Sequence, residues 1–228
     1  MLSETATFEQ IAASLAHEVK NPLSLVRANI DLLELDDDNK LYEKNYRIMR
    51  REIDRVNALL LDFIQIADPS EISPEHICIV QMLRELCDSL STSYYGKIGF
   101  YFSYDKALTI SADERKLRQV FYNIIKNCVE SIEVEHGSGF SNGLVEIAIH
   151  EQGDFLKIII SDNGGGITDE SLQKIRQPFY TTKSGGSGLG LYFCKSVIAR
   201  HGGTFEITNK PCGNNGCAVT ITLPYQAT

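Results

Sequence analysis

The stretch with the clearest chemical potential lies near the N-terminus, where residues 14 to 25 read SLAHEVKNPLSL. His17 is followed directly by Glu18, in a segment whose apolar spacing predicts a helix. A neutral imidazole beside a carboxylate is a competent nucleophile, and Glu18 is placed to polarise the ring or to take its proton. The sequence therefore predicts nucleophilic chemistry at His17, with an ordinary solvated histidine as the alternative.

The helical face that His17 occupies favours the chemical interpretation. The apolar stripe of this segment centres near the direction of Leu15 and Leu33, and His17 lies roughly 160° away from it. A structural core histidine would instead lie within the stripe. Pro22 removes the hydrogen bond to the carbonyl of Glu18, which costs about 3 kcal/mol in a regular helix. We therefore expect a kink that opens the backbone beside the imidazole to a second domain.

Two asparagines form the next candidate site, in the segment QVFYNIIKNCVESI of residues 119–132. Asn123 and Asn127 are four residues apart and share one face of the predicted helix, which differs from its main apolar face. Their amide oxygens suit Mg²⁺, which prefers hard oxygen ligands. The alternative is a pair of exposed or capping amides.

Two glycine-rich stretches follow in the C-terminal half. IIISDNGGGITD, residues 158–169, places Asp162 at the end of an apolar strand, where its carboxylate could accept a hydrogen bond from an exocyclic amine such as that of adenine. In residues 178–198, Thr182 and Lys183 precede a flexible segment, and a helix is predicted to begin at about Leu189. A helix N-terminus attracts anions, so this stretch predicts a lid over phosphates. Taken singly, a glycine-rich turn and a flexible linker remain alternatives.

Two helices must position the N-terminal histidine. The three-and-four spacing of apolar residues predicts helices over 8–35 and 42–67, separated by the turn-forming run at 36–39. Each helix carries one narrow apolar stripe, and a single hairpin cannot cover both stripes. We therefore expect an antiparallel hairpin that pairs with a second copy as a four-helix bundle.

A different pattern begins after Pro74. We expect a short helix over 80–93 and two further helices. One runs over 113–135 with Asp113 as its N-cap, and the other runs over 188–201. Six runs rich in β-branched and aromatic residues predict strands, namely KIGFYF, ALTIS, GLVEIAIHE, FLKIIISD, GTFEITN and GCAVTITLP. The predicted fold class is α+β, with a helical hairpin over residues 1–70 and an α/β sandwich, a mixed sheet with helices on one face, over residues 71–228.

Composition limits the classes of function. Of 228 residues, 43% are hydrophobic and 23% charged, which fits a soluble globular protein, and a net charge of -8 argues against nucleic acid or anionic lipid as a general partner. No apolar stretch is long enough to span a membrane. Cys212 and Cys217 could pair or bind a metal, whereas Cys78, Cys87, Cys128 and Cys194 are interpreted as small buried hydrophobic residues in a reducing cytoplasmic compartment. The abrupt start on a helix suggests a portion of a longer sensor, which could be membrane-anchored.

Together these stretches resemble the catalytic core of a sensor histidine kinase of the two-component systems. HEVKNPL resembles the H box, QVFYNIIKN the N box, DNGGGI the G1 box, PFYTTK the F box and GSGLGL the G2 box. The motifs occur in the order and spacing of the family, and the resemblance covers nearly all of residues 7–224. FYTTK and the form of the N box are most similar to the sporulation and nitrogen-sensor branch.

The resemblance implies a fold, an activity and site residues. The sandwich would be an ATP-binding domain of the histidine kinase and Hsp90-like ATPase fold. His17 would be the phosphoacceptor, Glu18 its acid–base partner and Asn21 a water-orienting residue. Glu130 departs from the family pattern and receives no role. ATP and Mg²⁺ would be held by Asn123, Asn127 (the Mg²⁺ ligand), Asp162, Gly164, Gly166, Thr182, Lys183, Gly186, Gly188, Leu189 and Gly190.

The implied reaction is attack of a His17 nitrogen on the γ-phosphorus of Mg-ATP, followed by transfer to an aspartate of a response regulator. A hinge between Asp68 and Pro74 would let the two domains approach. The implied partners are a second copy through the hairpin, a receiver domain, and any inhibitor protein, which would dock on the same helices. Two rivals stay open: a chaperone-type or mismatch-repair-type ATPase without phosphohistidine chemistry, and a dimeric scaffold that binds nucleotide as a structural ligand.

Overall fold

The chain contains two compact units in this computed structural model. The structure describes residues 2–34, 42–67, 70–104, 106–137, 142–175, 177–183, 186–211 and 215–226. The first unit comprises Met1–Pro69 and Gln177–Gly190, and the second comprises Ser70–Arg176 and Leu191–Thr228.

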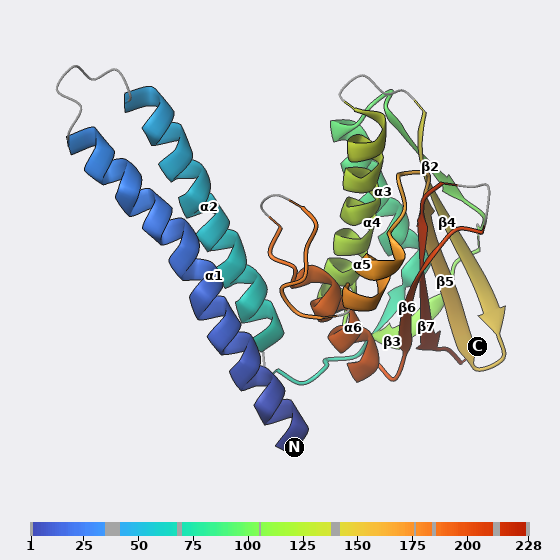
Figure 1. Ribbon diagram of the computed structural model, residues 1–228. Helices are drawn as coiled ribbons and strands as arrows, with labels where there is room; N and C mark the ends of the chain where they lie inside the picture. The colour runs from blue at the N-terminus through green and yellow to red at the C-terminus, as the bar shows by residue number, and fades with distance from the viewer. Residues whose placement is uncertain are drawn as a thin grey trace. The chain divides into compact units, whose positions relative to one another are not determined.

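The first unit contains two long helices, α1 (Leu2–Glu34) and α2 (Tyr42–Ala67), which lie side by side as the predicted hairpin (Figure 1). Leu15 of α1 and Val56 and Leu59 of α2 are buried between the helices. Other large apolar side chains of the hairpin stay exposed, as expected if one hairpin cannot cover both stripes. They include Leu25, Ile30, Tyr46, Ile53, Leu60, Leu61 and Ile64.

Pro22 does not end α1. The helix is continuous from Leu2 to Glu34, and the proline ring is buried rather than presented to solvent. Burial of the ring on the hairpin side offsets part of the lost hydrogen bond. The proline lies within a helix, as the sequence predicts, but local periodicity did not reveal that the ring itself packs in the interior.

The second unit is an α+β sandwich, as predicted. Its five-stranded mixed sheet has the order β2-β4-β5-β7-β6, and β1 and β3 form a separate antiparallel pair. Only β2 and β4 are parallel in the large sheet. The strands are β1 (Glu75–Cys78), β2 (Ile98–Phe102), β3 (Thr109–Ala112), β4 (Gly143–Gln152), β5 (Phe155–Asp162), β6 (Thr204–Asn209) and β7 (Cys217–Pro224). The helices are α3 (Ile79–Ser93), α4 (Glu114–His136), α5 (Asp169–Lys174) and α6 (Gly190–Arg200).

Alternation along the strands builds the core of the sandwich. Ile147 pairs with Ile160, and Ile158 pairs with Ile221, so buried side chains of β4, β5 and β7 form one continuous apolar face. Helix α4 packs on β4 and β5, and Figure 1 shows α3, α4 and α6 on the same side of the sheet. The Cys194 thiol of α6 also contacts the carbonyl of Val120 in α4 at 3.7 Å. Every nucleotide-site candidate of this unit therefore stands on a rigid, well-packed scaffold.

Two elements were not predicted from the sequence. The strand β1 has only four residues, two of them exposed and polar, and it exists because it pairs with β3 more than thirty residues later. Helix α5 has six residues and no buried side chain, so it shows no apolar period. By contrast, Asp113 does cap α4, since its carboxylate accepts the N–H of Lys116 at 3.0 Å.

The cysteines are mostly small hydrophobic residues, as expected. Cys87, Cys128 and Cys194 are buried, and burial raises the pKa of the Cys87 and Cys194 thiols to about 12. Cys78 was expected to be buried but is only half-buried. Any pairing of Cys212 with another residue lies outside the described residues. None of the helices in the described ranges combines the length and hydropathy needed to cross a membrane.

We expect Phe121→Ala to destabilise the second unit strongly. Phe121 is 0% exposed in α4, so truncation removes a full aromatic side chain and leaves a cavity that costs about 3 to 5 kcal/mol. Urea unfolding followed by circular dichroism measures the free energy of unfolding. Tyr122→Ala is the matched control because its side chain, next along α4, is 37% exposed. An equal loss in both variants would contradict the packing described here.

Candidate functional site

His17 stands on the exposed face of α1, as the helical wheel predicts. Asn21 lies one turn further along and is also exposed, so the two side chains share a solvent-facing surface. Glu18 is half-buried at the flank of this surface. Its carboxylate lies 3.9 Å from the guanidinium of Arg55 in α2. The imidazole is therefore open to an incoming group, and its neighbour in sequence is a carboxylate that lies close to a guanidinium.

Asp162 ends β5 inside the second unit and is fully buried, with 0% exposure. One carboxylate oxygen, Oδ1, accepts the N–H of Gly164 at 2.8 Å. The other, Oδ2, accepts from the Cys217 thiol at 3.0 Å. A carboxylate offers about four lone pairs, so each oxygen can still accept one further hydrogen bond. This arrangement fixes the plane of a buried acceptor at the end of a strand.

The glycines after Asp162 are required by close packing. A Cβ on Gly164 would lie 2.3 Å from Ser131 Oγ and 2.9 Å from the backbone nitrogen of Ile132, both in α4. Gly166 has a φ of +72°, which disfavours any residue with a side chain. The DNGGGI loop is thus pressed directly against α4. These contacts show why glycine is needed at both positions, and the alternative of a purely structural glycine-rich turn stays open for this stretch.

The same helix carries the two asparagines. Asn123 and Asn127 are both half-buried on α4, and Asn127 lies one turn before Ser131, which contacts the DNGGGI loop. The side-chain oxygen Oδ1 of Asn123 accepts a hydrogen bond from Nε2 of Gln119 at 3.0 Å. The structure therefore brings Asn127, Gly164 and Asp162 into one region of the second unit.

Four residues that support this region were missed from the sequence. The Asn163 side chain accepts the N–H of Leu144 at 2.8 Å, which ties the loop to β4. Asn209 at the end of β6 accepts the N–H of Ile167 at 2.8 Å. A Cβ on Gly216 would lie 2.0 Å from the carbonyl oxygen of Asp162, and Cys217 follows with its thiol on the carboxylate. Their only sequence signal was the position of polar or glycine residues at strand ends.

The glycine-rich lid candidate forms a closed loop in the first unit. The N–H of Phe179 donates to the carbonyl of Gly188 at 3.1 Å, and a Cβ on Gly188 would lie 2.4 Å from the Phe179 backbone. Phe179 itself has a φ of +64°, a strained value for a residue with a side chain. The backbones of Phe179 and Gly188 therefore pack directly against each other, which requires glycine at position 188.

The remaining lid candidates lie on and after this loop. Thr182 and Lys183 are exposed, and the N–H of Gly186 donates to the carbonyl of Lys183 at 3.3 Å. The N–H of Leu189 donates to Ser187 Oγ at 3.2 Å. Helix α6 begins at Gly190, one or two residues later than predicted, so Gly186 and Gly188 precede a helix N-terminus as expected.

The sequence-predicted site residues thus fall into two groups. Asp162, Gly164, Gly166, Asn123 and Asn127 belong to the second unit. His17, Glu18, Asn21 and the residues from Thr182 to Gly190 belong to the first unit. The first group contains an exposed histidine and a glycine loop before a helix, and the second contains a buried carboxylate.

The comparisons with known proteins give two family matches, which together cover most of the chain. Residues 112–227 match the model of the histidine kinase-, DNA gyrase B- and HSP90-like ATPase family. Residues 9–71 match the His Kinase A phospho-acceptor domain. The fold and the site therefore define an ATPase-type sandwich joined to a phosphoacceptor hairpin. The chain belongs to the sensor histidine kinase family and corresponds to the catalytic core of these kinases.

Curated relatives match along almost the whole chain. Sporulation kinase B of Bacillus subtilis is 33% identical over 219 residues, covering 94% of this chain and 49% of the relative. Sporulation kinase A of the same organism is 31% identical, with 94% and 34% covered, and AtoS of Escherichia coli is 30% identical, with 96% and 35% covered. The chain thus spans half or less of the length of these relatives.

Solved structures share the fold. The complex of the histidine kinase ThkA with the response regulator protein TrrA matches with a TM-score of 0.75 at 22% identity, covering 98% of this chain and 64% of the matched chain. The catalytic domain of ThkA alone matches with a TM-score of 0.55 at 25% identity, covering 67% and 96%. Full-length ShkA in complex with AMPPNP matches with a TM-score of 0.64 at 20% identity, covering 97% and 47%.

Proposed function

We propose that this chain autophosphorylates His17 from Mg-ATP and passes the phosphoryl group to an aspartate of a response regulator. The observation that carries the proposal is the exposed His17 of α1 within a matched phosphoacceptor domain, in one chain with the buried Asp162 of a matched ATPase domain. The test is incubation with γ-labelled ATP, which should give protein-bound label that is acid-labile and alkali-stable. Label on the protein that resists acid would overturn the proposal.

The transfer is a balanced displacement at phosphorus. A His17 ring nitrogen attacks the γ-phosphorus, the new N–P bond forms, and the bond to the β,γ-bridging oxygen breaks with departure of ADP. Glu18 takes the proton from the ring, and Asn21, on the same face, orients water for a phosphatase reaction. An aspartate oxygen of the receiver domain then attacks the phosphorus and releases the imidazole. Positioning and charge neutralisation supply most of the catalysis.

We assign nucleotide recognition to residues that meet the adenine base, to Asn123, and to the residues of the lid. Asp162 accepts a hydrogen bond from the adenine amine, and Gly164 and Gly166 allow the purine to approach the backbone. Asn123 lies near the phosphates. Lys183 neutralises phosphate charge from the lid. The other lid contacts come from the Thr182 hydroxyl and the backbone of Gly186, Gly188, Leu189 and Gly190 at the start of α6.

The half-buried amide of Asn127 fits a magnesium ligand. Its carbonyl oxygen is a hard donor, and Mg²⁺ commonly binds through one or two protein oxygens together with substrate phosphates. No cluster of three histidine, cysteine or acidic residues suited to a metal occurs in the described ranges, which agrees with an ion held largely by the nucleotide. When bound, the ion would neutralise charge on the β- and γ-phosphates.

The relatives support part of the proposed partners and role. The ThkA complex contains a response regulator protein, which supports a receiver domain as the acceptor, and the names of the Bacillus relatives support a role in sporulation control. A receiver domain, and any inhibitor protein, would dock on the hairpin around His17. The proposed domains are residues 1–70 for dimerisation and phosphotransfer and 71–228 for ATP binding. The setting is the cytoplasm, as part of a longer sensor that could be membrane-anchored.

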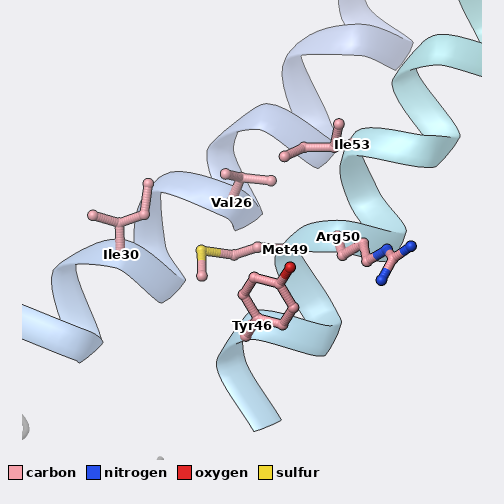
Figure 2. A pocket seen from close by; sticks show the side chains of 6 residues that line it. All are labelled: Val26, Ile30, Tyr46, Met49, Arg50 and Ile53. Carbon is pink, nitrogen blue, oxygen red and sulfur yellow. The ribbon is translucent and has the colours of Figure 1, made fainter. Parts of the chain in front are cut away.

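The apolar surface of the hairpin supports a homodimer. A groove of about 360 Å³ lies between α1 and α2, lined by Val26, Ile30, Tyr46, Met49, Arg50 and Ile53 (Figure 2). Ile30 is 44% exposed and Ile53 46% exposed, although both are strongly apolar. Such a continuous apolar stripe needs a covering partner, and a second hairpin with the same stripe would supply one.

We expect Ile53→Lys to convert the dimer to a monomer. Burying an isoleucine contributes about 1.5 to 3 kcal/mol, occurs twice in a symmetric pair, and would be replaced by two buried charges. Light scattering after size-exclusion chromatography measures the mass. Val134→Lys is the matched control, because Val134 is 84% exposed at the end of α4. A dimeric Ile53→Lys variant would place the interface elsewhere.

The two rivals are weaker. A chaperone-type or mismatch-repair-type ATPase would share the sandwich, but the match of residues 9–71 to a phospho-acceptor domain does not favour it. A scaffold that binds nucleotide without chemistry would not need an exposed histidine beside a glutamate. ATP hydrolysis without acid-labile label would favour the first rival, and nucleotide binding without either activity would favour the second.

A further inference from the structure

The segment that follows α2 is held by the second unit through a cluster of polar residues outside the nucleotide site. The Lys116 ammonium donates to Ser70 Oγ at 2.8 Å and to the Ser70 carbonyl at 3.2 Å. The Arg200 guanidinium donates to the same carbonyl. The N–H of Ser73 donates to Asp113 Oδ2 at 3.3 Å. We name these residues, together with His201, the linker clamp.

Two charged side chains of the linker clamp are buried. Lys116 is 6% exposed and Asp113 is 7% exposed, and charged groups are rarely so buried unless they are satisfied. Burial alone would raise the pKa of Asp113, but hydrogen bonds from Lys116 and Ser73 and the nearby cations lower it overall. The carboxylate is therefore ionised at pH 7 and binds α4 and the linker at once.

His201 completes the clamp from the end of α6. The N–H of Asp113 donates to His201 Nε2 at 3.1 Å, and the other ring nitrogen lies 2.8 Å from the carbonyl of Val197. Nε2 must therefore be the unprotonated nitrogen and Nδ1 the donor. Burial lowers the pKa of His201, which keeps the ring neutral at pH 7 and this geometry intact.

Lys116 of the clamp lies on α4, the helix that also carries the nucleotide-site asparagines. Asn123 follows Lys116 by seven residues of α4, a distance of about 10 Å along the helix axis. Only two residues separate Ala67, the last residue of α2, from Ser70. The clamp therefore fixes where the chain leaves the sandwich relative to the nucleotide site. The hinge expected between Asp68 and Pro74 stays a prediction, and within that range Ser70 and Ser73 are hydrogen-bonded to α4 and its N-cap.

We propose that Lys116 is a positioning residue for phosphoryl transfer, which it serves by holding Ser70 and thereby restraining the linker that joins the hairpin to the catalytic unit. The inference rests on the proposed kinase function. Lys116 acts through the linker and not on the nucleotide. Because misplacement of reacting groups by about 1 Å can cost 10²-fold in rate, release of the linker should slow the transfer while ATP binding persists.

The test uses Lys116→Met in the whole chain, with Lys157→Met of β5 as the matched control. We expect the autophosphorylation rate at saturating ATP to fall at least about tenfold and the ATP Kd to stay within about twofold. Hydrogen exchange should rise at the Ser73 amide but not in β5. Ser70→Ala, which removes one acceptor from an exposed residue, should give a smaller loss of rate, and it serves as the test if Lys116→Met does not fold.

The outcomes separate this inference from the proposed function. An unchanged rate in a variant with raised exchange at Ser73 would overturn the positioning role. An unchanged exchange would overturn the clamp itself, and a tenfold loss of ATP affinity would place Lys116 in nucleotide binding instead. A wild-type chain that forms no phosphohistidine would contradict the proposed function, whereas a loss confined to Lys116→Met and Ser70→Ala supports the inference.

Discussion

His17→Gln is expected to abolish acid-labile phosphorylation completely while leaving ATP binding within about twofold of the wild-type Kd. The amide of glutamine keeps the length and polarity of the side chain but has no nucleophilic ring nitrogen. His17 is exposed on α1, so the substitution leaves no cavity and should not change the stability of the hairpin. The measurement is incorporation of γ-phosphate into protein, together with calorimetric titration of nucleotide.

The matched control for this prediction is His76→Gln. His76 is also exposed but lies on β1 of the second unit. It should retain full phosphorylation. If His17→Gln still formed acid-labile phosphate, another histidine would be the acceptor and the assignment of α1 as the phosphoacceptor helix would be wrong.

Periodicity predicted most of the fold because the long helices and strands obey local rules. Helix α4 was predicted from its apolar face and its Asp113 cap, and the structure confirms both. β5 was predicted from an apolar run ending at DNGGGI. The short strand β1 was missed because its existence depends on pairing with β3, which no local pattern reveals.

The candidate site was only partly visible for the same reason. The exposed position of His17 follows from helix geometry alone. The contacts of Asp162 with Cys217 and Gly216 join residues more than fifty positions apart, so they depend on the pairing of β5 with β7. The burial of Lys116 was not predicted either, because a lysine in the first turn of a helix is ordinarily exposed to solvent. In the folded chain, Lys116 is buried and donates a hydrogen bond to Ser70 of the linker.

Asp162→Asn is expected to weaken ATP binding by about 10- to 100-fold, which corresponds to the loss of one or two charge-assisted hydrogen bonds. The carboxylate accepts from Gly164 at one oxygen and from Cys217 at the other. An asparagine can accept at only one of these atoms. If its oxygen stays with Gly164, its NH₂ group replaces the acceptor proposed to meet the adenine amine. The measurement is the Kd for ATP by titration calorimetry.

Binding of inosine triphosphate distinguishes loss of base recognition from loss of the folded pocket in Asp162→Asn. Its base has a carbonyl where adenine has the amine, so the wild-type carboxylate should reject it and bind ATP at least about tenfold more tightly. The NH₂ group that Asp162→Asn introduces could donate to that carbonyl, so the preference for ATP should shrink or reverse. Asp154→Asn, in the exposed turn before β5, should keep the wild-type preference. Equal weakening for both nucleotides would mean that Asp162 supports the fold of the pocket but does not contact the base.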